Sequence, residues 1–451
     1  MLLWSGAPPR SLISRWTIPE MMLRAESLNR FTSLLLPGLL LGLFLVLAPI
    51  EPVLGQPDSC GVQRDVGTRA LDERVWKQLN VIYEKVSAQQ YDEAYEDLRK
   101  MLGKAGREPY LQAILNQALA QVEWSRGNYQ ASLGFFEQAV ELNTLPDQAH
   151  FTLMYQIAQL YFMQDRYDEA LEKLDLWFCE SPAEEITSAA YVLQASIYIQ
   201  KEDYAGAVRA IDQAISVDDD PKEPWYQLKL AAQYELEQFP QATATLEIMV
   251  SKWPGNKTYW TQLSQIYFRL QKVDQALAVQ ALAYRNGLLD KQTDLLYLSS
   301  LYSNSDVPFK AAAVLQNGIE AGIVESNTYH WTIVAESWYA AEELERSLLA
   351  YEQAGTAASD GVIDLRRSFI LVDLERWPAA LESLDLALQK GGLDERKTAE
   401  VYLLRGMAQF NLGNFDSASA DWGRASRYEK TREAARQWMI HLQEERRRRT
   451  S

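Results

Sequence analysis

The stretch that decides the fold, residues 260–283, reads WTQLSQIYFRLQKVDQALAVQALA. It contains two amphipathic segments, and each carries one small residue, Ser264 in the first and Ala276 in the second. Apolar residues spaced three and four apart give the first segment a single apolar face, and a small residue on each segment lets two helix axes approach closely. The stretch therefore predicts a pair of packed helices.

The small residue of the second segment recurs along the chain at intervals of 33 to 38 residues. The ten positions are Ala94, Ser132, Ala170, Ala207, Ala242, Ala276, Ala311, Ser347, Ala380 and Ala418. Four residues later an apolar or aromatic residue follows in nine of the ten repeats, and Gln280 is the exception. A repeat of this length indicates an array in which each unit packs only on its neighbours. We predict an all-α, right-handed solenoid of about ten helix pairs over residues 71–429.

The first helices carry a matching small residue in most repeats, whereas repeat one has Ile82 there. These residues are Ala120, Ala158, Ala195, Ser264, Ser299, Ala335, Ser368 and Gly406. Repeat five is irregular when it is aligned on Trp225, because one extra residue then separates Trp225 from Ala242. The alignment of repeat five therefore stays open.

The spacing within residues 260–283 resembles that of the tetratricopeptide repeat (TPR), a helix–turn–helix unit of about 34 residues. The matching residues, counted from Trp260, are Leu263, Ser264, Tyr267, Ala276 and Ala283. Two positions depart from the family pattern: Ser264 replaces a usual glycine, and Gln280 replaces a usual phenylalanine. The resemblance implies a binding groove lined by the first helix of each repeat.

Ring-bearing and polar residues lie at the first-helix positions that line the groove in this family. We predict a protein-binding groove formed by Trp124, Tyr155, Phe162, Phe268, Tyr339 and Phe410. Large, rigid side chains make good peptide anchors; the alternative is that these rings pack against neighbouring repeats. The Lys, Asn and Arg residues with which chaperone-binding repeats hold a terminal carboxylate are missing, so a chaperone adaptor is not expected.

The first 55 residues predict a secretory signal peptide. Residues 31–50 carry no charge and follow Arg24 and Arg30. Cleavage before Gln56 would place Val53 at position −3 and Gly55 at position −1, and small or medium-sized residues are usual there. The alternative is an uncleaved inner-membrane anchor, since such a run is long enough to span a bilayer. Met21 or Met22 is an alternative start. We expect a periplasmic protein with a flexible leader over residues 56–70.

The chain has only two cysteines, Cys60 and Cys179. In an oxidising compartment they could pair. The alternative, which we favour from the sequence, is two unpaired thiols, one in the leader and one in a helix.

Composition and motifs argue against several functions. The formal net charge of −17 disfavours contact with nucleic acid. None of the three histidines lies in an H-E-x-x-H motif, and G-x-S-x-G, a phosphate-binding loop and a cysteine cluster are missing. We therefore expect no catalytic residues, no metal and no cofactor; an envelope hydrolase with an unrecognised site is the alternative from another class.

Residues 430–451 follow the last repeat. Five apolar residues predict a capping helix over residues 430–445: Ala434, Ala435, Trp438, Met439 and Leu442. The run Arg446–Arg449 suits the C-terminal end of a helix. The alternative is a basic tail that contacts anionic lipid or an acidic partner. Membrane contact is expected only here or through the signal segment.

The opening of the mature chain, Ala70–Leu79, runs directly into repeat one. In this feature the chain is most similar to periplasmic TPR proteins assigned to TonB systems, which accompany TonB, ExbB and ExbD. That resemblance implies a scaffold for energised iron or cobalamin uptake and carries over no residue roles. The alternative is an assembly factor for outer-membrane or exopolysaccharide machinery. The oligomeric state stays open.

Overall fold

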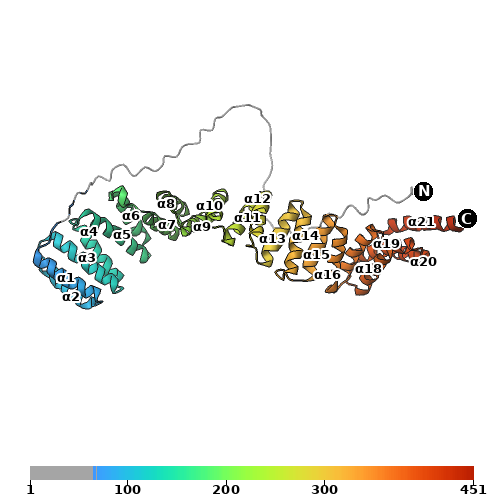
Figure 1. The fold of residues 1–451 in the computed structure, drawn as a ribbon, viewed down its shortest axis with the longest axis horizontal. Helices are drawn as coiled ribbons and strands as arrows, with labels where there is room; N and C mark the ends of the chain where they lie inside the picture. Colours follow the sequence, from blue (N-terminus) through green and yellow to red (C-terminus); the bar gives the residue numbers. More distant parts are fainter. Residues whose placement is uncertain (1–63, 65, 68, 451) are drawn as a thin grey trace, which may run out of the picture. The chain divides into compact units, whose positions relative to one another are not determined.

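The structure is a computed structural model that describes residues 64, 66, 67 and 69–450. The predicted signal peptide, most of the predicted leader and Cys60 lie outside the described residues. Within the described part the chain forms 21 α-helices and one short 3₁₀ helix, η2 (Ala183–Glu185), and no strand (Figure 1). This confirms the prediction of an all-α fold.

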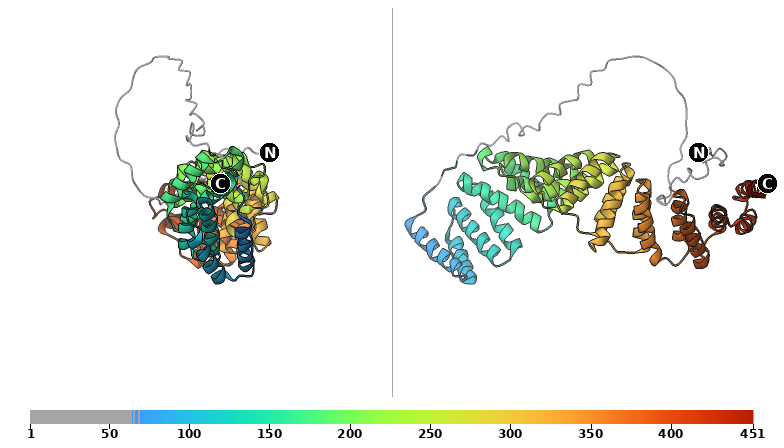
Figure 2. Two further views of the ribbon diagram at one scale, coloured as in Figure 1. Left: turned by 90° about the vertical axis from the view of Figure 1, so that its left-hand side faces the viewer. Right: turned by 45° about the vertical axis from the view of Figure 1, so that its right-hand side comes forward.

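Twenty of the helices form ten consecutive pairs, which Figure 2 shows from two further sides. The first five pairs are α1 (Glu73–Ser87) with α2 (Tyr91–Lys104), α3 (Pro109–Ser125) with α4 (Tyr129–Glu141), α5 (Asp147–Met163) with α6 (Tyr167–Glu180), α7 (Ser188–Gln200) with α8 (Tyr204–Val217), and α9 (Glu223–Glu235) with α10 (Phe239–Lys252). The next five are α11 (Lys257–Arg269) with α12 (Val273–Arg285), α13 (Gln292–Asn304) with α14 (Pro308–Glu320), α15 (Thr328–Ala340) with α16 (Leu344–Thr356), α17 (Val362–Asp373) with α18 (Trp377–Lys390), and α19 (Glu395–Asn411) with α20 (Phe415–Ala425).

The turn inside every pair is built in the same way. Five residues before the small residue of the second helix stands a residue with positive φ. The ten are Gln89, Gly127, Asp165, Glu202, Glu237, Gln271, Asp306, Glu342, Glu375 and Gly413. The amide of the following residue donates back to the last turn of the first helix, as from Lys272 N to Tyr267 O at 2.8 Å. This is a Schellman motif, which ends a helix and reverses the chain.

This turn settles the alignment of repeat five. Glu237 precedes Ala242 by the same five residues as in the other nine pairs, so the repeat holds no extra residue. Tyr226, which is 5% exposed, occupies the position of Trp260, which is 8% exposed. The interpretation of an extra residue in repeat five is wrong, because it aligned Trp225 with Trp260, whereas Tyr226 is the residue that occupies this position.

The small residues meet where the two helices of a pair cross, and the ten on the second helices are all buried. Where the small residue is serine, its hydroxyl donates to a backbone carbonyl, which lies on the opposite helix for Ser132, Ser264, Ser299 and Ser347 and in the same helix for Ser368. Ser264 Oγ donates to Ala276 O at 2.8 Å, and Ser347 Oγ donates to Ala335 O at 2.7 Å. Both bonds join residues twelve apart in sequence. Serine therefore replaces the usual small apolar residue without leaving a buried hydroxyl unpaired.

In the last pair, Gly406 on the first helix leaves room for the large side chain of Trp422 on the second helix. A Cβ at Gly406 would lie 2.4 Å from Nε1 of Trp422. Trp422 is fully buried and its indole donates to Leu403 O at 3.1 Å. The two helices can approach around this ring only because residue 406 has no side chain.

The final helix, α21 (Arg432–Thr450), covers the end of the array, as predicted. Ala435 and Leu442 are buried, and Trp438 stacks on Trp422 with 5.4 Å between ring centroids. The helix continues through the arginine run, and Arg446 forms an ion pair with Asp416 in α20.

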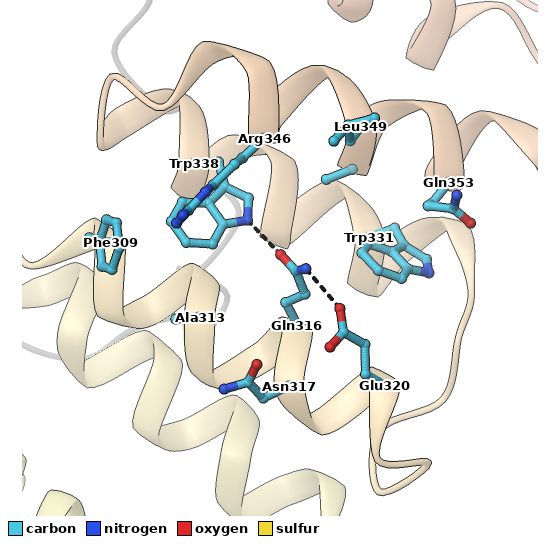
Figure 3. Close-up of a pocket in the computed structure, with 11 residues that line it drawn as sticks. Phe309, Ala313, Gln316, Asn317, Glu320, Trp331, Trp338, Arg346, Leu349 and Gln353 are labelled. Carbon is cyan, nitrogen blue, oxygen red and sulfur yellow. Dashed lines mark hydrogen bonds between the residues drawn. The ribbon is translucent and has the colours of Figure 1, made fainter.

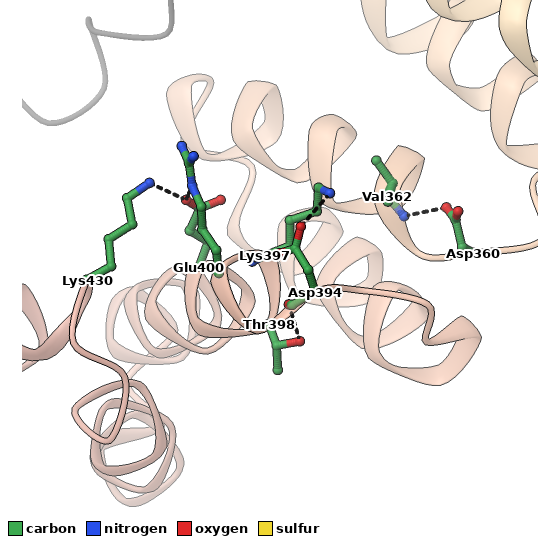
Figure 4. Close-up of polar contacts among 8 residues, drawn as sticks. Asp360, Val362, Asp394, Lys397, Thr398, Glu400 and Lys430 are labelled. Atoms are coloured by element: carbon green, nitrogen blue, oxygen red, sulfur yellow. Dashed lines mark hydrogen bonds and ion pairs between the residues drawn. The ribbon is translucent and has the colours of Figure 1, made fainter. Parts of the chain in front are cut away.

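Figure 4 shows polar contacts at the N-terminal ends of α17 and α19, and a contact between α19 and the segment before α21. Asp394 caps α19 by accepting from the Lys397 amide at 2.7 Å. Glu400, in the same helix, accepts from Lys430 Nζ at 3.2 Å, just before α21 begins. The contact of Glu400 with Lys430 joins the last pair to the segment that leads into the capping helix.

Cys179 lies in α6 and is disulfide-bonded. No free cysteine occurs among the described residues. The interpretation of Cys179 as an unpaired thiol is therefore wrong. Separately, no helix in the described part of the chain is long and apolar enough to cross a membrane.

Candidate functional site

A row of rings runs along the first helices, three residues before the positive-φ residue of each turn. Six of the ten pairs have a ring here: Trp124, Phe162, Tyr234, Phe268, Tyr339 and Phe410. Five of these were predicted from the sequence. Tyr234 was missed because repeat five was misaligned; counting back from Glu237 in the turn would have found it.

Most rings of this row are covered within their own helix pair. The second helix begins with another ring, which packs against the row ring edge-on or tilted. The pairs are Trp124–Tyr129 at 5.7 Å, Phe162–Tyr167 at 6.0 Å, Tyr234–Phe239 at 6.2 Å and Phe410–Phe415 at 5.4 Å between centroids. Such contacts stabilise the turn, so these rings have a structural role whatever else they bind.

Of the six pairs with a ring in the row, two lack the covering ring, because α12 begins with Val273 and α16 begins with Leu344. Their row residues are the more exposed ones: Phe268 is 39% exposed and Tyr339 is 42% exposed. Phe268 has its nearest ring contact with Tyr297 of the next pair, at 6.4 Å. The structure thus leaves these two predicted residues with free ring surface.

Tyr339 also has a polar neighbour in the next pair. Its hydroxyl donates to Asp373 Oδ2 at 3.5 Å, and partial burial raises the pKa of the Asp373 carboxyl above its usual range. A hydroxyl and a carboxyl therefore flank the exposed ring and offer hydrogen bonds to a ligand that packs on it.

The other predicted residues lie in packing contacts. Tyr155 packs on Trp177 of its own pair at 5.4 Å, and burial raises the pKa of its hydroxyl. Phe410 is covered by α21, with Trp438 at 6.0 Å and His441 at 5.4 Å. The capping helix therefore occupies the place where Phe410 would meet a partner.

Uncharged polar side chains lie three residues before the row position, and so about one helical turn away, in five of the repeats. They are Gln121, Gln159, Ser196, Gln265 and Ser300, and all are partly or fully exposed. Amide and hydroxyl groups can both donate to and accept from a peptide backbone. Rings and amides side by side on rigid helices suit an extended polypeptide more than a charged ligand.

Models of the tetratricopeptide repeat match residues 110–175, 188–221 and 228–287. This chain contains tetratricopeptide repeats. Tetratricopeptide-repeat proteins are generally non-catalytic scaffolds that bind other proteins. No curated protein matches the sequence of this chain.

Three solved structures are among those similar to this chain. A tetratricopeptide repeat protein from Parabacteroides merdae ATCC 43184 is 15% identical, with 66% of this chain and 100% of that chain covered and a TM-score of 0.35. Naa15/Naa10 bound to HypK-THB is 12% identical, with 80% and 64% covered and a TM-score of 0.42. The TPR2AB-domain:pHSP90 complex of yeast Sti1 is 13% identical, with 57% and 98% covered and a TM-score of 0.29. At these identities the likeness is one of fold alone.

A hollow of about 600 Å³ lies away from the ring row, on the second helices of TPR units seven and eight (Figure 3). Residues of α14 and α16 line it, together with Trp331 and Trp338 of α15. None of the residues predicted for the groove lines it. Nothing in the repeat pattern of the sequence predicted this hollow.

The described histidines are held by packing. Burial, and secondly the positive charge of Arg64, lowers the pKa of His150 to about 4. His330 is buried with Nδ1 2.7 Å from Glu325 O. Among the residues that the structure describes, no group of three or more His, Cys, Asp or Glu side chains could hold a metal ion.

Proposed function

We propose that this chain is an exported, non-catalytic TPR scaffold that binds extended segments of other envelope proteins. The observation that carries this proposal is the free ring surface of Phe268 and Tyr339 on the first helices. Both rings are exposed because the second helix of their pair begins without a ring. A large apolar side chain without a cover on a rigid helix is a ready anchor for a partner.

The neighbouring groups suggest how a segment would bind. Gln265 is exposed and lies one helical turn from Phe268, so its amide can bond to the backbone of a peptide packed on the ring. Asp373 beside Tyr339 adds an acceptor. The net charge of −17 favours a neutral or basic segment over an acidic one.

The proposed compartment and the proposed partners are supported by features of the sequence. Residues 1–55 support export, and the similarity over Ala70–Leu79 supports TonB, ExbB or ExbD as partners. None of the comparisons with known proteins bears on the TonB assignment. Within this proposal the chain would hold components of an energised uptake system together in the periplasm.

The test is photo-crosslinking in cells. A photoreactive amino acid replaces Phe268 in the full chain, and captured proteins are identified by mass spectrometry. The matched control carries the same group at Leu282, an exposed residue of the second helix α12 that is 47% exposed. We expect TonB, ExbB or ExbD to be captured from residue 268 and not from residue 282.

Other outcomes reject parts of the proposal. Capture of outer-membrane assembly or polysaccharide proteins from residue 268 would keep the scaffold and discard the TonB system. Equal capture from both residues would remove the assignment of the binding surface to the ring row.

A further inference from the structure

The hollow between α14 and α16 owes its character to two residues that break the pattern of the repeat. Phe309 stands two residues before the small residue of α14, and Leu349 stands two residues after that of α16. They are 44% and 63% exposed. An exposed large apolar residue needs a reason when the same position elsewhere is small or polar.

The other nine repeats supply that comparison within the chain itself. At the position of Phe309 they carry Asp92, Gln130, Asp168, Ala205, Pro240, Asp274, Glu345, Pro378 and Asp416. At the position of Leu349 they carry Glu96, Gly134, Glu172, Arg209, Ala244, Ala278, Ala313, Glu382 and Ala420. The fold therefore requires no large apolar residue at either position. The two exceptions lie on neighbouring second helices and line the same hollow.

Inside the hollow the polar groups are held in place (Figure 3). The Trp338 indole donates to Gln316 Oε1 at 2.9 Å, and Gln316 Nε2 donates to Glu320 Oε1 at 2.8 Å. This chain of bonds fixes the carboxylate of Glu320 at one side of the hollow. Its only partner is a neutral amide, since no ion pair involves Glu320 among the described residues.

The positive charge of the hollow is already matched. Arg346 lies over the Trp338 ring at 4.7 Å and over the Phe309 ring at 5.3 Å, and it pairs with Glu343 at 3.8 Å. The guanidinium of Arg346 therefore already interacts with two rings and a carboxylate of this chain. Of the two charged side chains that line the hollow, Glu320 and Arg346, only Glu320 has no counter-ion among the described residues.

The geometry points to a second interaction site in this hollow, which receives a lysine or arginine side chain of a basic segment in a partner protein. The charged head would lie against Glu320 and the face of Trp331. Its aliphatic stem, and an apolar neighbour in the same segment, would pack on Leu349 and Phe309. The charge of −17 on the whole chain favours the approach of such a segment. This site is independent of the ring row on the first helices.

Two short fluorescein-labelled peptides test the site, with binding to the full chain measured by fluorescence anisotropy. One carries leucine–lysine pairs separated by glycine and serine, and its matched version replaces each lysine with glutamate. We expect the basic peptide to bind at least about tenfold more tightly than the acidic one, a difference of one decade in Kd. Equal binding of the two peptides would overturn the proposal.

Three variants locate the binding. Phe309→Gln and Leu349→Ala introduce residue types found at these positions in other repeats, so both variants should fold. Each should weaken binding of the basic peptide by about tenfold. Glu320→Gln should weaken it and reduce its dependence on salt.

One control variant tests whether the peptide binds in this hollow and not elsewhere on the chain. Leu282→Ala removes an exposed leucine from another second helix and should leave the affinity unchanged. An unchanged affinity in Leu349→Ala, or an equal loss in Leu282→Ala, would overturn the assignment. If sedimentation shows that the chain self-associates and that Leu349→Ala abolishes this, the occupant is a second copy and the proposal fails.

Discussion

Gln280 is the residue at which TPR unit six departs from the pattern inside its own core. The equivalent residue in the other nine units is apolar or aromatic. Gln280 is fully buried, and neither Oε1 nor Nε2 has a hydrogen-bond partner among the residues that the structure describes. We predict that Gln280→Leu stabilises the protein.

The magnitude follows from the two amide atoms. A buried polar group without a partner costs about 1–3 kcal/mol, and leucine removes that cost while keeping a side chain of similar size. Leucine already fills the equivalent position in several repeats, including Leu246 in repeat five and Leu315 in repeat seven, both fully buried. We therefore expect the free energy of unfolding of this region to rise by about 1–3 kcal/mol.

Urea unfolding alone would average over an array whose repeats unfold in part independently. The assay is therefore hydrogen exchange of α12, read by mass spectrometry, with urea unfolding beside it. The matched control is Gln265→Leu in the same repeat, where the glutamine is exposed and the change should stay within about 0.5 kcal/mol. Unchanged or faster exchange of α12 in Gln280→Leu would refute the reasoning and mean that the amide is satisfied in solution.

Three further predictions concern the helix crossings, the turns and acid stability. Ala276→Leu should overpack a fully buried crossing and lower the free energy of unfolding by about 1–3 kcal/mol in urea; an unchanged midpoint would contradict the alignment. Glu342 and Gly413 both have positive φ, a conformation that is unfavourable for residues with a side chain. Measured by urea unfolding, Glu342→Gly should therefore raise the free energy of unfolding by about 1 kcal/mol, and Gly413→Ala should lower it by about 1 kcal/mol. The pKa of His150 is lowered from 6.5 to about 4, so its contribution to stability is present above pH 6.5 and is lost as the pH falls toward 4. Urea midpoints of His150→Gln should therefore fall less over this range than those of the unchanged chain, and equal falls would contradict the role of burial.

Much of the fold could be predicted because the information is local and repeated. A small residue recurs on each second helix, and a large one follows a turn later in all repeats but the one that contains Ala276 and Gln280. Ten repetitions make such a pattern visible where one would not. The error in repeat five came from adjacent aromatic residues, Trp225 and Tyr226: the alignment was anchored on Trp225, whereas Tyr226 occupies the buried position.

The candidate site could be predicted only in part. The spacing of the repeats locates the ring row, but it does not show which of these rings are packed against another ring. That contact depends on the first residue of the second helix, which is a ring in four of these pairs but Val273 in α12 and Leu344 in α16. The contact of Phe410 with α21 joins elements that are separate in the sequence. The hollow beside Leu349 depends on contacts between two neighbouring second helices, which no single repeat specifies.

The central claim is that the exposed rings of Phe268 and Tyr339 bind a partner and are dispensable for folding. The most direct measurement compares the full chain with the double variant Phe268→Ala/Tyr339→Ala, using the partner captured by crosslinking and measuring both Kd and the urea midpoint. Trp124→Ala, which removes a ring covered by Tyr129, is the matched control. We predict that the double variant weakens binding by about tenfold or more with an unchanged midpoint, whereas the control lowers the midpoint. Equal loss of binding and stability in the double variant would show that these rings belong to the core and would contradict the account.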